Sequence, residues 1–145
     1  MAQIYQRGRL LEKEVFIKAT PERVFQALTA KEDLERWFVS RAETDLFPGG
    51  TLKFKWGPGE CFIGEVLVFE PPHRLCYTWE ADNPGINTLT FELTAENDGT
   101  RLRLVHTGIG ESEDWDRYYD EVHIGWNEHF TNLIAWVERS SERTW

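Results

Sequence analysis

The stretch TLTFELTAENDGTRLRLVHTG, residues 88–108, contains two alternating runs separated by a turn signal. Apolar residues occupy every second position in both runs, and mostly polar or charged residues lie between them. The Asn-Asp-Gly at 97–99 is typical of a tight turn. Period two with one apolar face predicts a β-hairpin whose inner face is buried and whose outer face contacts water. Because His106 shares its parity with Leu102 and Leu104, we expect its side chain to face the core.

The same alternation extends the sheet on the N-terminal side of this hairpin. The runs 51–56 and 74–79 alternate in the same way, the run 61–69 is apolar on both faces, and the segment 10–18 indicates a first strand. Turn dipeptides separate the later runs at intervals of roughly 8–14 residues, which is the spacing of an antiparallel meander. Parity places four cations on the outer face, where we expect them to pair with glutamates such as Glu92: Lys53, Lys55, Arg101 and Arg103.

Helical patterns flank the strand segments. Thr20 followed by Pro21 is typical of a helix N-terminus, and apolar residues then recur at helical spacing. The segment 31–38 predicts a second short helix. From Ser112 to Glu138, apolar residues recur every three or four positions, which predicts one long amphipathic helix with Ser112 as its N-cap. We interpret the acidic run 111–121 as the start and solvated face of this helix, with an acidic docking surface as the alternative.

The predicted order is one strand, two short helices, six strands and one long helix, in a single domain covering residues 1–145. A sheet with one apolar face must be covered, and the C-terminal helix is the only predicted element long enough to do so. The sequence therefore predicts an α+β fold in which a curved antiparallel sheet wraps around a long C-terminal helix. Such a sheet leaves space between itself and the helix, and cavities of this kind hold small apolar ligands.

The charge balance disfavours several classes of partner. The 145 residues include 16 Lys and Arg against 25 Asp and Glu, a net charge of −9. Nucleic acids and anionic membrane surfaces bind basic patches, so neither is an expected partner. No stretch approaches the roughly 18–20 apolar residues of a membrane helix, and the N-terminus lacks the apolar core of a signal peptide. We therefore expect a cytoplasmic protein with reduced cysteines.

Six motifs follow one another through most of the chain: TPERVFQALT (20–29), LERWF (34–38), FPGG (47–50), GEVLVFEPPHRLCYTWE (64–80), TLTFELTAENDGTRLRLVHTG (88–108) and GW (125–126). Their order and spacing resemble those of the START-like (SRPBCC) superfamily and its helix-grip, or START/Bet v 1-like, fold. Within it, the chain is similar to the group related to the C-terminal domain of the activator of heat-shock protein 90 ATPase. The resemblance implies a deep hydrophobic pocket between sheet and long helix. It does not fix the function, because the superfamily hosts lipid carriers, hormone receptors, cyclases and co-chaperone domains.

Large aromatic residues and one histidine are the candidate ligand-binding residues, because parity or helical spacing turns most of them toward the expected cavity. His106 is the candidate polar anchor for a ligand, with a satisfied core histidine as the alternative. The aromatic residues either line a pocket for a ring-shaped or acyl ligand or simply fill the core. The full set is Trp37, Phe38, Trp56, Tyr77, Trp79, His106, Tyr119 and Trp126.

The sequence shows no motif for a metal, a cofactor or nucleophilic catalysis. His123 and His129 are six positions apart, about 240° around a helix, so they cannot both bind one metal directly. Neither Cys-x-x-Cys nor His-Glu-x-x-His occurs, and no serine lies in Gly-x-Ser-x-Gly. Cys61 and Cys76 are not cross-strand neighbours in the expected hairpin, so geometry disfavours a disulfide between them.

Three functions follow as hypotheses. The favoured one is binding of a small hydrophobic or aromatic ligand in the internal cavity, in a carrier, sensor or stress-related role. The alternative, implied by the resemblance, is a protein-interaction module whose partner is a chaperone. The third is an enzyme such as a cyclase or hydrolase, which would need an acid–base pair in the pocket. His106 is the one inward titratable group that the pattern supports, and its partner is not identifiable from sequence, so the enzyme is the least favoured of the three hypotheses. A second titratable group within hydrogen-bond reach of His106 would favour it.

Overall fold

The computed structural model describes residues 9–57, 61–79, 87–109 and 113–142. The elements follow the predicted order of one strand, two helices, six strands and one long helix. Their bounds are β1 Arg9–Ile17, α1 Pro21–Thr29, α2 Lys31–Trp37, β2 Arg41–Thr44, β3 Thr51–Lys55, β4 Cys61–Glu70, β5 Arg74–Trp79, β6 Asn87–Glu96, β7 Gly99–Ile109 and α3 Glu113–Glu142.

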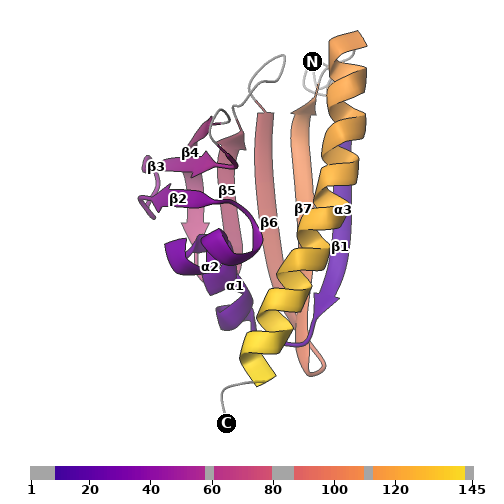
Figure 1. Ribbon diagram of the computed structural model, residues 1–145. Coiled ribbons are helices and arrows are strands. Elements are labelled where there is room, and N and C mark those ends of the chain that lie inside the picture. The colour runs from indigo at the N-terminus through magenta and orange to yellow at the C-terminus, as the bar shows by residue number, and fades with distance from the viewer. Residues whose placement is uncertain (1–8, 58–60, 80–86, 110–112, 143–145) are drawn as a thin grey trace.

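The strands form one antiparallel, seven-stranded sheet in the order β1-β7-β6-β5-β4-β3-β2 (Figure 1). In the β6–β7 hairpin, Leu89 pairs with His106 and Phe91 pairs with Leu104. All four side chains are buried, so they share the inner face of the sheet. The alternation predicted for residues 88–108 is confirmed, and with it the inward orientation of His106.

All three helices lie on the same face of the sheet, and α3 runs along its length (Figure 1). α1 begins at Pro21, and the side chain of Thr20 accepts a hydrogen bond from the Arg23 N–H at 3.2 Å, as an N-cap does. The predicted N-cap of α3, Ser112, lies outside the described residues. The predicted α+β helix-grip fold is confirmed. The buried positions of α3 in its C-terminal two thirds are Trp126, Phe130, Leu133 and Val137.

β2 is the strand that the sequence pattern does not locate. It carries one buried apolar side chain, Ala42. Glu35 in α2 holds it in place, because Oε2 of Glu35 accepts hydrogen bonds from the Lys31 ammonium at 2.7 Å and from the Ala42 N–H at 2.9 Å. These two donors lower the pKa of the Glu35 carboxyl. Polar contacts with α2, together with pairing to β3, therefore position this edge strand.

Ion pairs cover part of the outer face of the sheet, as the sequence predicts. Arg103 pairs with Glu92 at 2.8 Å and also with Glu12 on the neighbouring strand β1. Arg101 pairs with Glu96 at 2.5 Å, and the hydrogen bonds from its guanidinium lower the pKa of Glu96. The arginines of this face are thus matched by carboxylates, as expected of a solvated surface.

Cys76 carries a free, buried thiol and lies opposite Val68 in the β4–β5 hairpin, so its cross-strand neighbour is not Cys61, in line with the prediction. The side chain of Cys61 lies outside the described part of the chain. In the residues that the structure describes, no helix is long and apolar enough to cross a membrane. Within those same ranges, no three His, Cys, Asp or Glu side chains gather as a metal site would require.

Candidate functional site

Aromatic side chains from the sheet, from α2 and from α3 meet on the inner face of the sheet. Centroids of neighbouring rings lie about 4–6.5 Å apart, in stacked, tilted and edge-on arrangements. Most of them are buried. We call this set the aromatic cluster: Trp37, Phe38, Phe54, Trp56, Phe62, Tyr77, Trp79, Phe91, Trp126, His129 and Phe130.

Phe38, the C-cap residue of α2, lies at the centre of the aromatic cluster. Its ring stacks on Trp37 at 4.8 Å and on Trp126 of α3 at 5.7 Å. It also meets the edge of Trp56 at 5.4 Å and packs against Trp79 at 6.3 Å. One ring at the end of α2 therefore contacts side chains from β3, β5 and α3.

Strand pairing builds the sheet side of the aromatic cluster. Phe54 on β3 lies opposite Phe62 on β4, and their rings stack at 5.2 Å. Phe62 in turn packs on Trp79 of β5 with centroids 4.1 Å apart. The alternation that places these residues on one face therefore also places them in rows across adjacent strands. Each such ring pair contributes about 0.5–1.5 kcal/mol beyond the burial of its surface.

The structure brings six of the eight predicted site residues together in this cluster. Trp56 is only partly buried, so the cluster reaches the molecular surface at the end of β3. Trp37 donates its indole N–H to the Ala27 carbonyl oxygen at 2.8 Å, so this N–H is already hydrogen-bonded within the protein. The binding role of these residues stays a prediction. The six are Trp37, Phe38, Trp56, Tyr77, Trp79 and Trp126.

Tyr77 and Trp79 are neighbours on the inner face of β5, and their ring centroids lie 6.4 Å apart. Burial, with a smaller contribution from Cys76, raises the pKa of the Tyr77 hydroxyl far above its ordinary value. The hydroxyl therefore keeps its proton at all physiological pH values. Tyr77 supplies a neutral hydroxyl group in a largely apolar setting.

His106 is fully buried beside the aromatic cluster. Its Nε2 lies 2.6 Å from Oδ1 of Asn87, and because an amide oxygen only accepts, the imidazole N–H is the donor. Asn87 lies opposite Trp79 in the β5–β6 register, so the polar pair adjoins the aromatic rings. Burial lowers the pKa of His106 to about 4, which makes the imidazole neutral at pH 7.

Tyr119, the remaining predicted site residue, lies apart from these groups. It is seven residues before Trp126, which places it about 10 Å along the axis of α3. Its ring is partly buried and lies 6.4 Å from that of His123. Tyr119 also packs against the hydrophobic core, but it is not one of the rings by which the aromatic cluster is defined. Helical periodicity predicts on which face of α3 Tyr119 lies. It does not predict the position along the helix axis, and the same face of this 30-residue helix continues past the cluster.

The site also contains residues outside the predicted set, namely two polar ones, His129 and Asn87, and four phenylalanines: Phe54, Phe62, Phe91 and Phe130. His129 contacts Phe38 at 4.8 Å and Trp126 at 5.4 Å, both edge-on, and burial lowers the pKa of its imidazole. Its position three residues after Trp126 is the signal that places it on the same side of α3. Asn87 shares its parity with Leu89, Phe91 and Leu93, and that parity is the signal that places it on the inner face of β6.

Comparison with known proteins finds one family whose model matches most of the chain. A family model described as Activator of Hsp90 ATPase homolog 1-like protein matches residues 18–138. A search among curated proteins found no match.

Solved structures with the same fold are numerous. Protein MLL2253 from Mesorhizobium loti is 28% identical over 90% of this chain and 98% of its own, with a TM-score of 0.79. CalU16 from Micromonospora echinospora is 26% identical over 94% of this chain and 79% of its own, with a TM-score of 0.71. The Aha1 dimer from Colwellia psychrerythraea, 23% identical over 90% of this chain and 96% of its own, has a TM-score of 0.79 and is similar in fold.

Proposed function

The chain belongs to the family of Activator of Hsp90 ATPase homolog 1-like proteins, and on that premise we propose that it binds a small hydrophobic or aromatic molecule at the aromatic cluster. The ligand lies between the inner face of the sheet and α3, as in a carrier or sensor. Ligand sites of this kind combine an apolar lining with a few polar groups that set orientation.

The observation that carries this proposal is the position of the His106–Asn87 pair. A neutral imidazole and an amide, both fully buried, adjoin the ring of Trp79 through the β5–β6 register. Burying such a pair in a packed core costs folding free energy unless its hydrogen bonds are satisfied. Hydrogen bonds are directional, so the pair also sets the direction from which a ligand's polar group can approach. A ligand hydroxyl or carbonyl that joins this hydrogen-bonding set gains orientation in an otherwise apolar site.

The aromatic rings supply the affinity in this proposal. Burial of apolar ligand surface contributes about 25 cal/mol per Å², from which the cost of ordering the ligand is subtracted. Trp56, partly buried at the end of β3, gives the ligand an aromatic surface near solvent. Flat, ring-shaped molecules suit this lining best, because offset-stacked and edge-on contacts with the existing rings are then available.

Titration calorimetry with 2-naphthol, which joins an aromatic body to one hydroxyl, tests the proposal. The full chain is expected to bind one molecule, and Trp79→Leu is expected to weaken binding by about tenfold, or about 1.4 kcal/mol. The matched control is Phe47→Leu, since Phe47 is 56% exposed and outside the cluster. Absence of binding to the wild-type chain, or binding that occurs only after Trp79 is replaced, contradicts the proposal, because the rings would then simply fill the core.

A second candidate function is a protein-interaction module acting on a chaperone, which the printed family description favours. Exposed carboxylates on the first turns of α3, including Asp116, Asp120 and Glu121, would meet a basic surface of the partner. In a pull-down at low salt with the chaperone Hsp90 of the same cell, recovery of Hsp90 supports this candidate. Failure to recover it at low salt, where such contacts are strongest, counts against it.

Catalysis is less well supported than binding. The observed partner of His106 Nε2 is the amide of Asn87, which does not titrate. A neutral histidine hydrogen-bonded to an amide orients a ligand but is not an acid–base pair.

The proposal includes a cytoplasmic location, which the free thiol of Cys76 supports.

A further inference from the structure

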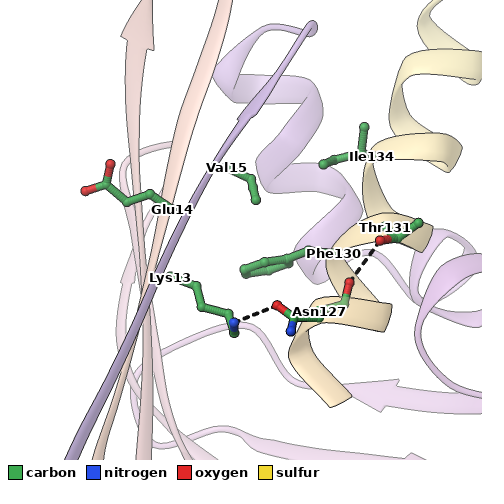
Figure 2. Close-up of a pocket in the computed structure, with 7 residues that line it drawn as sticks. All are labelled: Lys13, Glu14, Val15, Asn127, Phe130, Thr131 and Ile134. Carbon is green, nitrogen blue, oxygen red and sulfur yellow. Dashed lines mark hydrogen bonds between the residues drawn. The ribbon is translucent and has the colours of Figure 1, made fainter. Parts of the chain in front are cut away.

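A groove with a volume of about 350 Å³ lies between β1 and the middle of α3. Its apolar surface comes from Val15 on β1 and from Phe130 and Ile134 on α3. Its polar groups include Lys13 and Asn127, whose side chains meet below the ring of Phe130 in the view of Figure 2. The volume is at the lower end of the range for ligand pockets, which favours a small molecule. We call it the β1–α3 groove.

Lys13 is a cation on the inner face of the sheet. Lys13 shares its parity in β1 with Leu11, Val15 and Ile17, of which Leu11 and Ile17 are buried, so it lies on the same face as these residues. Its Nζ donates a hydrogen bond to Oδ1 of Asn127 at 2.6 Å (Figure 2). Partial burial lowers the pKa of the Lys13 ammonium, because removing water disfavours the charged form.

A neutral amide is the partner of Lys13, whereas the arginines of the outer face have carboxylates. Arg101 and Arg103 each pair with glutamates. Glu14, the neighbour of Lys13 in sequence, extends away from the other groove side chains (Figure 2) and lies 3.5 Å from Arg101. In the ranges that the structure describes, no carboxylate forms an ion pair with Lys13. The groove thus holds a positive charge that forms no ion pair with the carboxylates that the structure describes.

We propose that the β1–α3 groove binds a small apolar monocarboxylic acid. The ammonium of Lys13 has three N–H donors and uses one on Asn127, while the side-chain NH₂ of Asn127 offers further donors beside it. A ligand carboxylate accepts from both groups, and hydrogen bonds of this charge-assisted kind are about twice as strong as neutral ones. The apolar part of the acid covers Val15, Phe130 and Ile134.

This site goes beyond the function proposed above. Phe130 is only 3% exposed and packs on Trp126 at 5.5 Å, so its ring stands between the β1–α3 groove and the rest of the aromatic cluster. A ligand in the groove therefore contacts Lys13 and β1, whereas a ligand in the aromatic cluster contacts Trp79 and Phe38. Binding at one site can fail while binding at the other succeeds.

Amide chemical-shift mapping on the full chain with phenylacetate, and in parallel with the uncharged analogue 2-phenylethanol, tests the inference. Phenylacetate is expected to shift the amides of Lys13, Val15 and Thr131 in a saturable way and to bind at least about tenfold more tightly than the alcohol. Lys13→Gln removes the charge, and Asn127→Asp places a competing carboxylate beside Lys13. Both are expected to lower phenylacetate affinity to that of the alcohol, while Lys53→Gln, on the exposed outer face, leaves it unchanged.

Three results would overturn the inference. The first is equal affinity for acid and alcohol, since the charge would then play no part. The second is unchanged phenylacetate binding in Lys13→Gln. The third is the lack of saturable shifts at the groove, including the case in which all shifts map to Trp79 and its neighbours. That last pattern supports the aromatic-cluster proposal while rejecting the groove.

Discussion

At the scale of single residues, burial rather than charge pairing controls the titration of His106. Its folded-state pKa is about 4, against an ordinary value of 6.5, because desolvation penalises the imidazolium. The unfolded chain therefore binds a proton between these two pKa values when the folded chain does not. The contribution of His106 to the free energy of unfolding is therefore fully present above pH 6.5, the pKa of the unfolded chain, and it is lost as the pH falls toward 4, the pKa of the folded chain.

We predict that unfolding free energy falls by about 2 kcal/mol between pH 7 and pH 5 through His106, and that His106→Gln removes that part of the decrease. Urea unfolding followed by circular dichroism at several pH values measures it. His123→Gln, which changes an exposed histidine of α3, is the matched control and keeps the wild-type slope. An unchanged slope in His106→Gln would assign the pH dependence to other groups, such as His129, whose pKa is also lowered by burial.

Asp33 is a buried carboxylate that connects the three helices. Its Oδ1 accepts from the Arg23 guanidinium of α1 at 2.9 Å and from the Trp136 indole N–H of α3 at 2.8 Å. We predict that Asp33→Ala lowers the free energy of unfolding by about 3 kcal/mol, because both donors lose a charged acceptor. Urea unfolding measures the loss. Glu32→Ala, at the exposed neighbouring position, is expected to be nearly neutral, and equal effects of the two variants would contradict this account.

Parity alone places His106 inward, because an alternating run needs no knowledge of the rest of the fold. Parity with Val15 and Ile17 also places Lys13 on the inner face. A lysine is not apolar, however, so a search for alternating apolar residues passes over it. The partners of these residues were not predictable. Asn87 and Asn127 reach them only through strand register and helix placement, which no local pattern contains.

At the scale of elements, β4 passes very close to β5 at Gly64. A Cβ added to Gly64 would overlap the carbonyl oxygen of Thr78 and lie 2.9 Å from the ring of Phe62. Glycine in a strand interior often marks such a close backbone approach. The irregular register between Val66 and Val68 lies a few residues further along the same strand. This segment therefore bends β4 beneath the aromatic cluster.

We predict that Gly64→Ala lowers the free energy of unfolding by about 2 kcal/mol, because the backbone of β5 must move to admit the methyl group. Gly125→Ala is the contrasting variant, since no atom lies within 4 Å of the new Cβ in the middle of α3. It is expected to stabilise the protein by about 0.5–1 kcal/mol through helix propensity. Urea unfolding distinguishes them, and a neutral Gly64→Ala would show that the strand has room to relax.

The elements most easily predicted are those with long periodic patterns. β6, β7 and α3 each carry several apolar residues at a constant spacing. β2 spans four residues with Ala42 as its buried apolar side chain, so its pattern is too short and too weak to locate. Its position depends on the Glu35 carboxylate of α2, a contact between elements that a pattern within one element does not contain.

At the scale of the whole molecule, the aromatic cluster joins the curved sheet to both α2 and α3. Parity and helical spacing predict that Trp79, Trp126 and Phe38 face inward, but not that they meet. The meeting depends on sheet curvature and on the loop that returns α2 to the sheet, which set distances between elements far apart in sequence. Tyr119 satisfies the same periodicity yet lies outside the cluster. The inward faces of the elements, and most of the residues that meet there, were therefore predictable, whereas the distances and contacts between residues of different elements were not.

The central claim is that a small aromatic molecule binds among these rings. Isotope-filtered nuclear Overhauser spectroscopy on the labelled full chain saturated with unlabelled 2-naphthol tests it most directly. If 2-naphthol binds at the aromatic cluster, its ring contacts the side chains of Phe38, Trp79 and Trp126, and its hydroxyl-bearing edge lies toward Asn87 and His106. Contacts confined to exposed residues such as Phe47, or no contacts at all, would contradict the claim and leave the aromatic cluster as a self-filled core.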